Sequence, residues 1–238
     1  PADNRPSAER RELGKLLFFD PRLSRGGRVS CASCHAPSAG WSDPRPHSVG
    51  DDGRPLHRRS MPVENTAWAA ALFWDGRAES LEAQALGPVE SPMEMNLTRQ
   101  LLEERLNAIA GYRARFRAAY GVDSITAADV GRAIASFERT IVTGRTPFDR
   151  WADGDSTAVS AEARQGFALF TGKAGCANCH AGWRFTDDSF HDIGVPVAAS
   201  APDSGRGTIV PLETMHFAFK TPGLRNVARR ALYLHDGS

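Results

Sequence analysis

Apolar residues recur every three or four positions through the middle of the chain, which is the spacing of an amphipathic helix. From residue 97 to residue 120 they are interspersed with Glu and Arg, which predicts a helix that breaks or kinks at Gly111. Thr126, with Asp129 three positions later, is similar to a capping box and predicts a further helix reaching about Val142. The spaced apolar positions of the first stretch are Leu101, Leu102, Leu106, Ile109 and Phe116.

A short frame of residues occurs twice. The frame consists of Ser-Ala-Glu, then Arg, Gly and an apolar Leu–Phe step, and it begins at Ser7 and again at Ser160. Each Ser is placed to cap a helix, with Glu in the first turn, where the helix dipole favours negative charge. No run alternates convincingly between apolar and polar residues, and Thr143–Pro147 has the composition of a linker. The pattern predicts a mainly α fold in two halves, with long loops at 38–60 and 186–212.

The charge balance argues against two classes of partner. The chain has 29 basic and 28 acidic residues and a net charge of +1, so neither nucleic acid nor an anionic membrane is expected to bind. The longest apolar run, around 67–74, is far shorter than the roughly 20 residues of a membrane span. No signal peptide is visible at residues 1–10, so for an exported protein we expect this to be the mature form.

All four cysteines lie in two Cys-x-x-Cys-His motifs, one in each half. The first is Cys31, Cys34 and His35, and the second is Cys176, Cys179 and His180. This is the attachment signature of a c-type haem. One helical turn brings the two thiols to the same face, where both reach the vinyl groups of one porphyrin, and the following His supplies its imidazole to the iron. The motifs predict two covalently bound haem c groups.

Other uses of paired cysteines fit less well. A zinc ribbon needs its two knuckles roughly 15–20 residues apart, whereas these are separated by most of the chain. A thioredoxin-type pair accounts for one motif but not for a His after both, and disulfides between residues three apart are uncommon. With both pairs used by haem, no cysteine remains free. Because this attachment takes place outside the bacterial cytoplasm, we expect a periplasmic protein.

The chain resembles the bacterial diheme cytochrome c peroxidases and their MauG-type relatives, over most of its length. The resemblance implies two cytochrome c-like domains: residues 1–145 with the peroxidatic haem, and residues 146–238 with the electron-transfer haem but without the family's C-terminal tail. The matching stretches are Leu13–Ser24, Phe73–Ala78, Gln84, Gly87-Pro88, Glu94-Met95, Leu224–Val227 and Tyr233–Gly237.

The resemblance also implies roles for single residues. Gln84, Pro88 and Glu94 match positions that line the distal pocket of the first haem, where hydrogen peroxide reacts. Glu94 matches the acid/base that moves a proton between the peroxide oxygens. Trp74 matches a tryptophan that relays electrons between the haems. Without the resemblance, each of these side chains would be ascribed to the core or the surface.

The sequence departs from the peroxidase pattern after the first motif. The peroxidases carry a removable sixth iron ligand, a His in a Ser-x-Gly-His stretch, and here Asp51 stands in that position. Asp is a poor ligand for haem iron, so the departure predicts an open, five-coordinate first haem, which is the MauG-type arrangement. His47 and His57 lie nearby and are alternative ligands.

Two further family features differ. The sixth ligand of the second haem, Met in peroxidases and Tyr in MauG-type enzymes, lies beyond the last residue of this chain. The internal alternatives are Met215, His216, His191 and Tyr233. Relatives also hold calcium through an Asn at the position of Ser60, and Ca²⁺ requires six or more oxygens. Calcium binding is therefore left open.

The favoured function is a MauG-type peroxidase or oxidase. Hydrogen peroxide would generate a high-valent diheme state that oxidises a periplasmic protein partner at a Trp or Tyr side chain. Trp41, Trp68, Trp151 and Trp183 are further stations for electrons, although each is more commonly a packing residue. The first alternative is a cytochrome c peroxidase that takes electrons from a small cytochrome or cupredoxin. The second alternative is a diheme electron carrier without enzyme activity.

Overall fold

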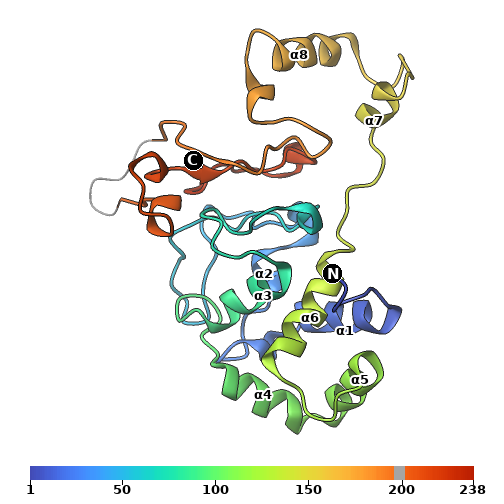
Figure 1. Ribbon diagram of the computed structural model, residues 1–238, viewed down its shortest axis with the longest axis vertical. Coiled ribbons are helices and arrows are strands. Elements are labelled where there is room, and N and C mark those ends of the chain that lie inside the picture. The colour runs from blue at the N-terminus through green and yellow to red at the C-terminus, as the bar shows by residue number, and fades with distance from the viewer. Residues whose placement is uncertain (196–201) are drawn as a thin grey trace. The chain divides into compact units, whose positions relative to one another are not determined.

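The computed structural model describes residues 1–195 and 202–238 and divides into two compact units (Figure 1). The first unit consists of Pro1–Ile141 together with Ala228–Ser238, and the second is Val142–Val227. Helices make up most of the regular structure, which confirms the mainly α prediction. The helices are α1 (Ala8–Phe18), α2 (Cys31–Cys34), α3 (Leu81–Glu90), α4 (Arg99–Ala108), α5 (Ala110–Tyr120), α6 (Ala127–Glu138), α7 (Pro147–Ala152) and α8 (Ala161–Thr171); the strands are β1 (Phe190–His191) and β2 (Phe219–Lys220).

The helix starts predicted from the repeated frame are confirmed. The Ser7 hydroxyl accepts a hydrogen bond from the Arg10 N–H at 3.2 Å, and the Ser160 hydroxyl accepts one from the Ala163 N–H at 3.2 Å. These bonds satisfy backbone donors that have no partner within the helix. The same two local signals therefore start α1 and α8 in the two units.

The predicted break at Gly111 is wrong, because this glycine is the second residue of α5. The helical stretch is interrupted at Ile109, whose backbone is extended and whose side chain packs against the core. The Thr126–Asp129 capping box is confirmed, but α6 ends at Glu138 rather than near Val142. Pro147, predicted to belong to a linker, begins α7, because a proline at the first helical position loses no hydrogen bond.

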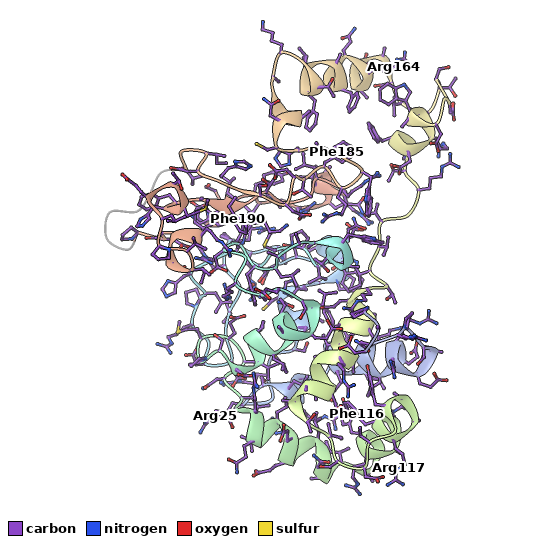
Figure 2. All side chains as sticks on the ribbon, in the orientation of Figure 1. Arg25, Phe116, Arg117, Arg164, Phe185 and Phe190 are labelled. Atoms are coloured by element: carbon purple, nitrogen blue, oxygen red, sulfur yellow. The ribbon has the colours of Figure 1, made fainter. Side chains whose placement is uncertain are left out.

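Helix α6 is the centre of the first unit, packing against α1 and α3. Val130, Ala133 and Ile134 are fully buried, as is Phe116 of α5 (Figure 2). The α1–α6 contact depends on Gly14, since a Cβ atom there would lie 1.9 Å from the Ala133 carbonyl oxygen. The backbones of α1 and α6 approach so closely at this point that only glycine fits at position 14.

Replacing Gly14 with Ala should therefore destabilise the first unit by about 1–3 kcal/mol, the usual cost of overpacking. The matched control is Gly111→Ala, because Gly111 lies in α5 with no atom within 4 Å of the added Cβ. The control should stabilise the protein by up to about 1 kcal/mol through helix propensity. Urea unfolding followed by circular dichroism measures both. Equal and favourable effects of the two substitutions would contradict the close helix crossing.

The second unit is built around a cluster of aromatic rings, and an ion pair joins α7 to Arg225. Phe148 lies with its ring centroid 5.2 Å from that of Phe167 and 5.2 Å from that of Phe185, which is labelled in Figure 2. Asp149 of α7 receives two hydrogen bonds from Arg225, at 2.7 and 2.8 Å, which hold the pKa of its carboxyl well below the usual range. The strands β1 and β2 form one antiparallel pair, with Phe190 opposite Lys220.

The unit boundary after Ile141 lies close to the predicted domain boundary at residues 145 and 146, whereas Ala228–Ser238, predicted to belong to the C-terminal domain, is part of the first unit. The assignment of one haem to each domain stays a prediction. Part of the loop predicted at 186–212 lies outside the described residues. Within the described ranges, no helix combines the length and apolar character needed to cross a bilayer.

Candidate functional site

The first cysteine motif forms a single helical turn. In α2 the Ser33 hydroxyl accepts a hydrogen bond from the Ser30 N–H at 3.0 Å, and the His35 N–H donates to the Cys31 carbonyl at 2.9 Å. The turn brings Cys31, Cys34 and His35 to one pocket. The spacing thus places two thiols and one imidazole against the same space, as the motif predicts.

The same pocket is lined by the three side chains predicted to lie on its distal side. Gln84 and Pro88 come from α3, and Glu94 comes from the turn that follows this helix. Ser80 starts α3 by accepting a hydrogen bond from the Ala83 N–H at 3.2 Å. The structure therefore brings these three residues together with the first motif. Their roles in catalysis stay predictions.

Burial controls the charge of two groups in this pocket. It raises the pKa of Glu94, an effect that Arg77 and a hydrogen bond from Ser91 partly oppose. It lowers the pKa of His35, which favours the neutral imidazole that binds a metal. In the described part of the chain, Nδ1 of His35 is buried without a hydrogen-bond partner. The pocket thus combines a neutral imidazole with a carboxyl that readily holds a proton.

Asp51, at the position of the family's removable His, is a structural anchor and not a pocket residue. Its carboxylate accepts hydrogen bonds from the Gly26 N–H at 2.6 Å and the Ser24 hydroxyl at 3.1 Å. Its own N–H donates to the Glu94 carbonyl at 2.7 Å, and Arg28 bonds to its carbonyl oxygen. Only 6% of Asp51 is exposed. The residue fastens the loop of the first motif to the turn that carries Glu94.

The alternative ligands for the first haem lie away from this pocket. His47 is half-buried and His57 is exposed, and neither is among the residues that line it. Ser60 does line the pocket, but its hydroxyl oxygen and its carbonyl oxygen are both engaged in hydrogen bonds. Its hydroxyl lies 2.7 Å from that of Ser48, and its carbonyl accepts from the Ser42 hydroxyl at 2.8 Å.

Trp74 is a buried residue of the first unit. Its indole N–H donates to the Arg59 carbonyl at 2.8 Å, and its ring centroid lies 6.4 Å from that of His235. It is 8% exposed and is held in one orientation. Its role as an electron relay stays a prediction.

The other tryptophans separate into two kinds. Trp41 packs against Phe137 in the core, with ring centroids 6.1 Å apart, and Trp151 belongs to the aromatic cluster of the second unit. Trp68 and Trp183 are about half exposed. Of these four predicted stations, Trp68 and Trp183 are therefore the two that present an exposed ring.

The imidazole of the second motif is held by a hydrogen bond that the imidazole of the first motif lacks among the described residues. Cys176 begins a 3₁₀ turn, and Nδ1 of His180 lies 2.9 Å from the Phe185 carbonyl oxygen. A proton on Nδ1 is donated to that carbonyl, which leaves Nε2 free for a metal. The ring is thereby held in the tautomer that an iron ligand needs.

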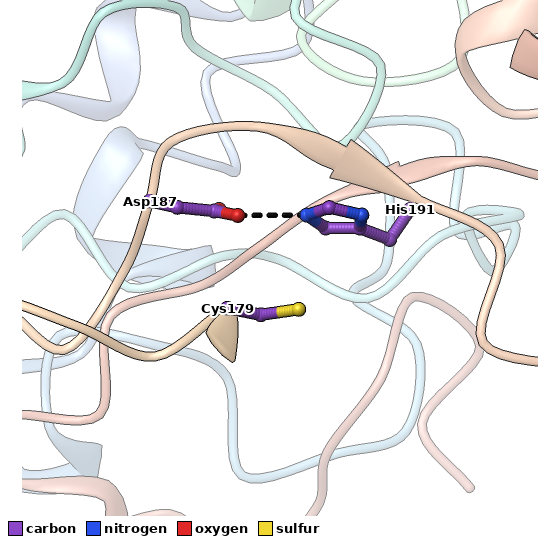
Figure 3. Close-up of side chains that lie close together, drawn as sticks. All are labelled: Cys179, Asp187 and His191. Carbon is purple, nitrogen blue, oxygen red and sulfur yellow. Dashed lines mark hydrogen bonds and ion pairs between the residues drawn. The ribbon is translucent and has the colours of Figure 1, made fainter. Parts of the chain in front are cut away.

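Figure 3 shows the polar groups beside this motif. The Cys179 sulfur and the side chains of Asp187 and His191 bring ligand atoms within 4.8 Å of one another. Nε2 of His191 lies 2.7 Å from the Asp187 carboxylate. Because Cys179 is one of the predicted haem-attachment residues, this cluster lies at the predicted second haem site. His191 is thus the internal candidate ligand found beside the motif, whereas Tyr233 belongs to the first unit.

One ionisable residue of the pocket was missed by the sequence analysis. Glu138, at the end of α6, lines the pocket of the first motif and is 4% exposed. A signal was present, because Glu138 follows Ile134 by four positions and so falls on the apolar face of the predicted helix.

The pocket is lined by two thiols, an imidazole, an amide and a carboxyl. This set of groups fits a haem that reacts with a small oxidant. Two such motifs in two helical units define a di-haem protein of the peroxidase class. Residues 8–157 match the model of the family described as di-haem cytochrome c peroxidase. The chain belongs to this family, and it is an oxidoreductase with two haem cofactors.

The relatives include both branches of the family. The chain is 55% identical to the methylamine utilization protein MauG of Methylorubrum extorquens, over all of this chain and 67% of the relative. It is 39% identical to the cytochrome c551 peroxidase of Nitrosomonas europaea, over 97% of this chain and 70% of the relative. A crystal structure of a MauG-like protein associated with microbial copper homeostasis superposes with a TM-score of 0.92 at 31% identity, over all of this chain and 75% of that one. Sequence similarity thus favours the MauG branch.

Proposed function

We propose that this protein is a MauG-type di-haem peroxidase that reacts with hydrogen peroxide at the first motif and withdraws electrons from a protein partner. The observation that carries this proposal is the shared pocket of His35, Gln84 and Glu94, with Asp51 anchored outside it. The position that would supply a second, blocking ligand carries a side chain that is already bonded to Ser24 and Gly26.

Each pocket residue has a definable task. Cys31 and Cys34 would hold the haem through thioether bonds, and His35 would bind its iron. The haem supplies a metal that binds peroxide and accepts its oxidising equivalents. Glu94 would take a proton from one peroxide oxygen and deliver it to the other, so that the O–O bond breaks and the second oxygen leaves as water. The raised pKa of Glu94 suits this two-way transfer, because burial makes the protonated acid easier to form than in an exposed carboxyl.

Neighbouring groups position the substrate. The Gln84 amide is a hydrogen-bond donor on the same pocket wall, and Pro88 adds a rigid surface without a backbone N–H. Trp74, held by its bond to the Arg59 carbonyl, offers a fixed aromatic ring for electron transfer. Cys176, Cys179 and His180 would hold the second haem, whose task in this proposal would be electron transfer.

The partner would be a protein whose Trp or Tyr side chain is oxidised at a distance, since such a residue cannot enter the pocket. The proposal includes a periplasmic location, because thioether attachment of haem takes place outside the bacterial cytoplasm. The proposal includes no calcium at Ser60, because the oxygens of this residue are engaged within the protein.

The test is rapid mixing of the resting, fully oxidised protein with hydrogen peroxide. We expect a spectral change of the first haem within the mixing experiment, and a high-spin ferric signal in the resting electron paramagnetic resonance spectrum. A resting protein that reacts only after one-electron reduction would support the cytochrome c peroxidase alternative. Two low-spin haems and no reaction with peroxide would support the electron carrier.

A further inference from the structure

Glu138 is a buried carboxyl that the steps above do not use. It lines the pocket of the first motif, it is 4% exposed, and its Oε2 has no hydrogen-bond partner in the portion of the chain that is described. Buried acids without partners are rare because burial removes their hydration. A Gln or Leu would fill the same space without this cost. The carboxyl is therefore suited to a task that needs an ionisable group.

Among the described residues, no hydrogen bond or ion pair joins Glu138 to a cationic side chain. The adjacent Arg139 forms two hydrogen bonds to Glu82 of α3, at 2.7 and 2.8 Å, and is thereby paired elsewhere. The other titratable groups that interact with the pocket end of α6 are Glu82 and, across the pocket, Cys31. Glu94 lines the same pocket, and α1 contributes an apolar face, with Leu17 and Phe18 buried.

These surroundings favour the protonated acid. Burial raises the pKa of Glu138 to about 8, and Glu82 adds to the shift while Arg139 opposes it. A positive charge that develops in the pocket would favour the carboxylate. Oxidation of a haem iron adds such a charge, so the proton of Glu138 and the electron of the haem are expected to be linked.

We propose that Glu138 is a redox-linked proton acceptor of the first haem, protonated when the iron is ferrous and ionised when the iron is ferric. On oxidation, one electron passes from the iron to an external one-electron acceptor, such as the electrode, and one proton passes from the Glu138 O–H bond to water. Reduction reverses both transfers. The proposal rests on the proposed function only in requiring a haem in this pocket.

The test is a spectroelectrochemical titration of the first haem in the native protein with both haems bound and in its Glu138→Gln variant, over the pH range around 8. In the native protein the midpoint potential should fall as pH rises, because the carboxylate stabilises the ferric state. The slope of potential against pH should approach the value for one proton released per electron. In Glu138→Gln the potential should be almost independent of pH. The matched control is Glu90→Gln at the exposed end of α3, which should keep the native slope.

Two results would overturn the proposal: a native slope in Glu138→Gln, or a slope that is lost in Glu94→Gln but kept in Glu138→Gln. If Glu138→Gln takes up no haem, redox-difference infrared spectroscopy of the native protein decides the question. The C=O band of a protonated carboxylic acid should disappear on oxidation, and a band that persists would contradict the proposal. Peroxide reactivity is measured separately, so a native protein with the pH-linked potential but no reaction with peroxide would refute the proposed function alone.

Discussion

A variant with Ser in place of both Cys31 and Cys34 should carry one haem instead of two and should lose its reaction with peroxide. These thiols line the pocket with His35, and no other cysteine occurs in the first unit. Without thioether bonds, the imidazole alone holds the haem, which washes out under denaturing conditions. Haem staining of denaturing gels and the pyridine haemochrome assay measure the loss.

The matched control is the variant with Ser in place of Cys176 and Cys179. It should also retain one haem, but that haem should still react with peroxide when oxidised protein is mixed with it. Loss of the fast reaction in the control but not in Cys31→Ser/Cys34→Ser would assign the peroxide site to the other unit. Full retention of both haems in either variant would refute thioether attachment at that motif.

Glu94→Gln should slow the reaction with peroxide by about 10²–10⁴-fold, the usual contribution of a positioned acid or base. Gln preserves the size of the side chain and its place in the pocket but cannot exchange a proton. Haem content and the resting spectrum should therefore be unchanged. Stopped-flow absorbance against peroxide concentration gives the rate constant, and Glu90→Gln, an exposed carboxyl paired with Arg99, is the control.

The pH profile adds a second readout of Glu94. Burial raises the pKa of this carboxyl, and the carboxylate is the form that accepts the first proton. The rate in the native protein should thus rise with pH through a value above 4.5, the ordinary pKa of Glu, and level off at higher pH. A profile that is unchanged in Glu94→Gln would assign the proton transfer to another group.

Local signals in the sequence were sufficient for helix starts and for the first motif. Ser7, Ser160 and the Thr126 capping box act through hydrogen bonds within four residues, so their effects can be read without the fold. Gly111 was misread because helix propensity is a weak signal, and the break was decided by the packing of Ile109 against the core.

The distal side of the pocket could be predicted only through family resemblance. Gln84 and Glu94 are ordinary polar residues in the sequence, and what gives them meaning is their approach to His35, some fifty positions earlier. Glu138 was missed for the same reason. A polar residue on an apolar helix face indicates something unusual, but its neighbours across the pocket become known only from the tertiary structure.

The return of the last residues to the first unit has a consequence for biosynthesis. The Arg59 N–H donates to the His235 carbonyl at 2.7 Å, and the His235 ring lies against Trp74. These contacts can form only after the intervening second unit has been synthesised, so the first unit cannot complete its packing from residues 1–141 alone.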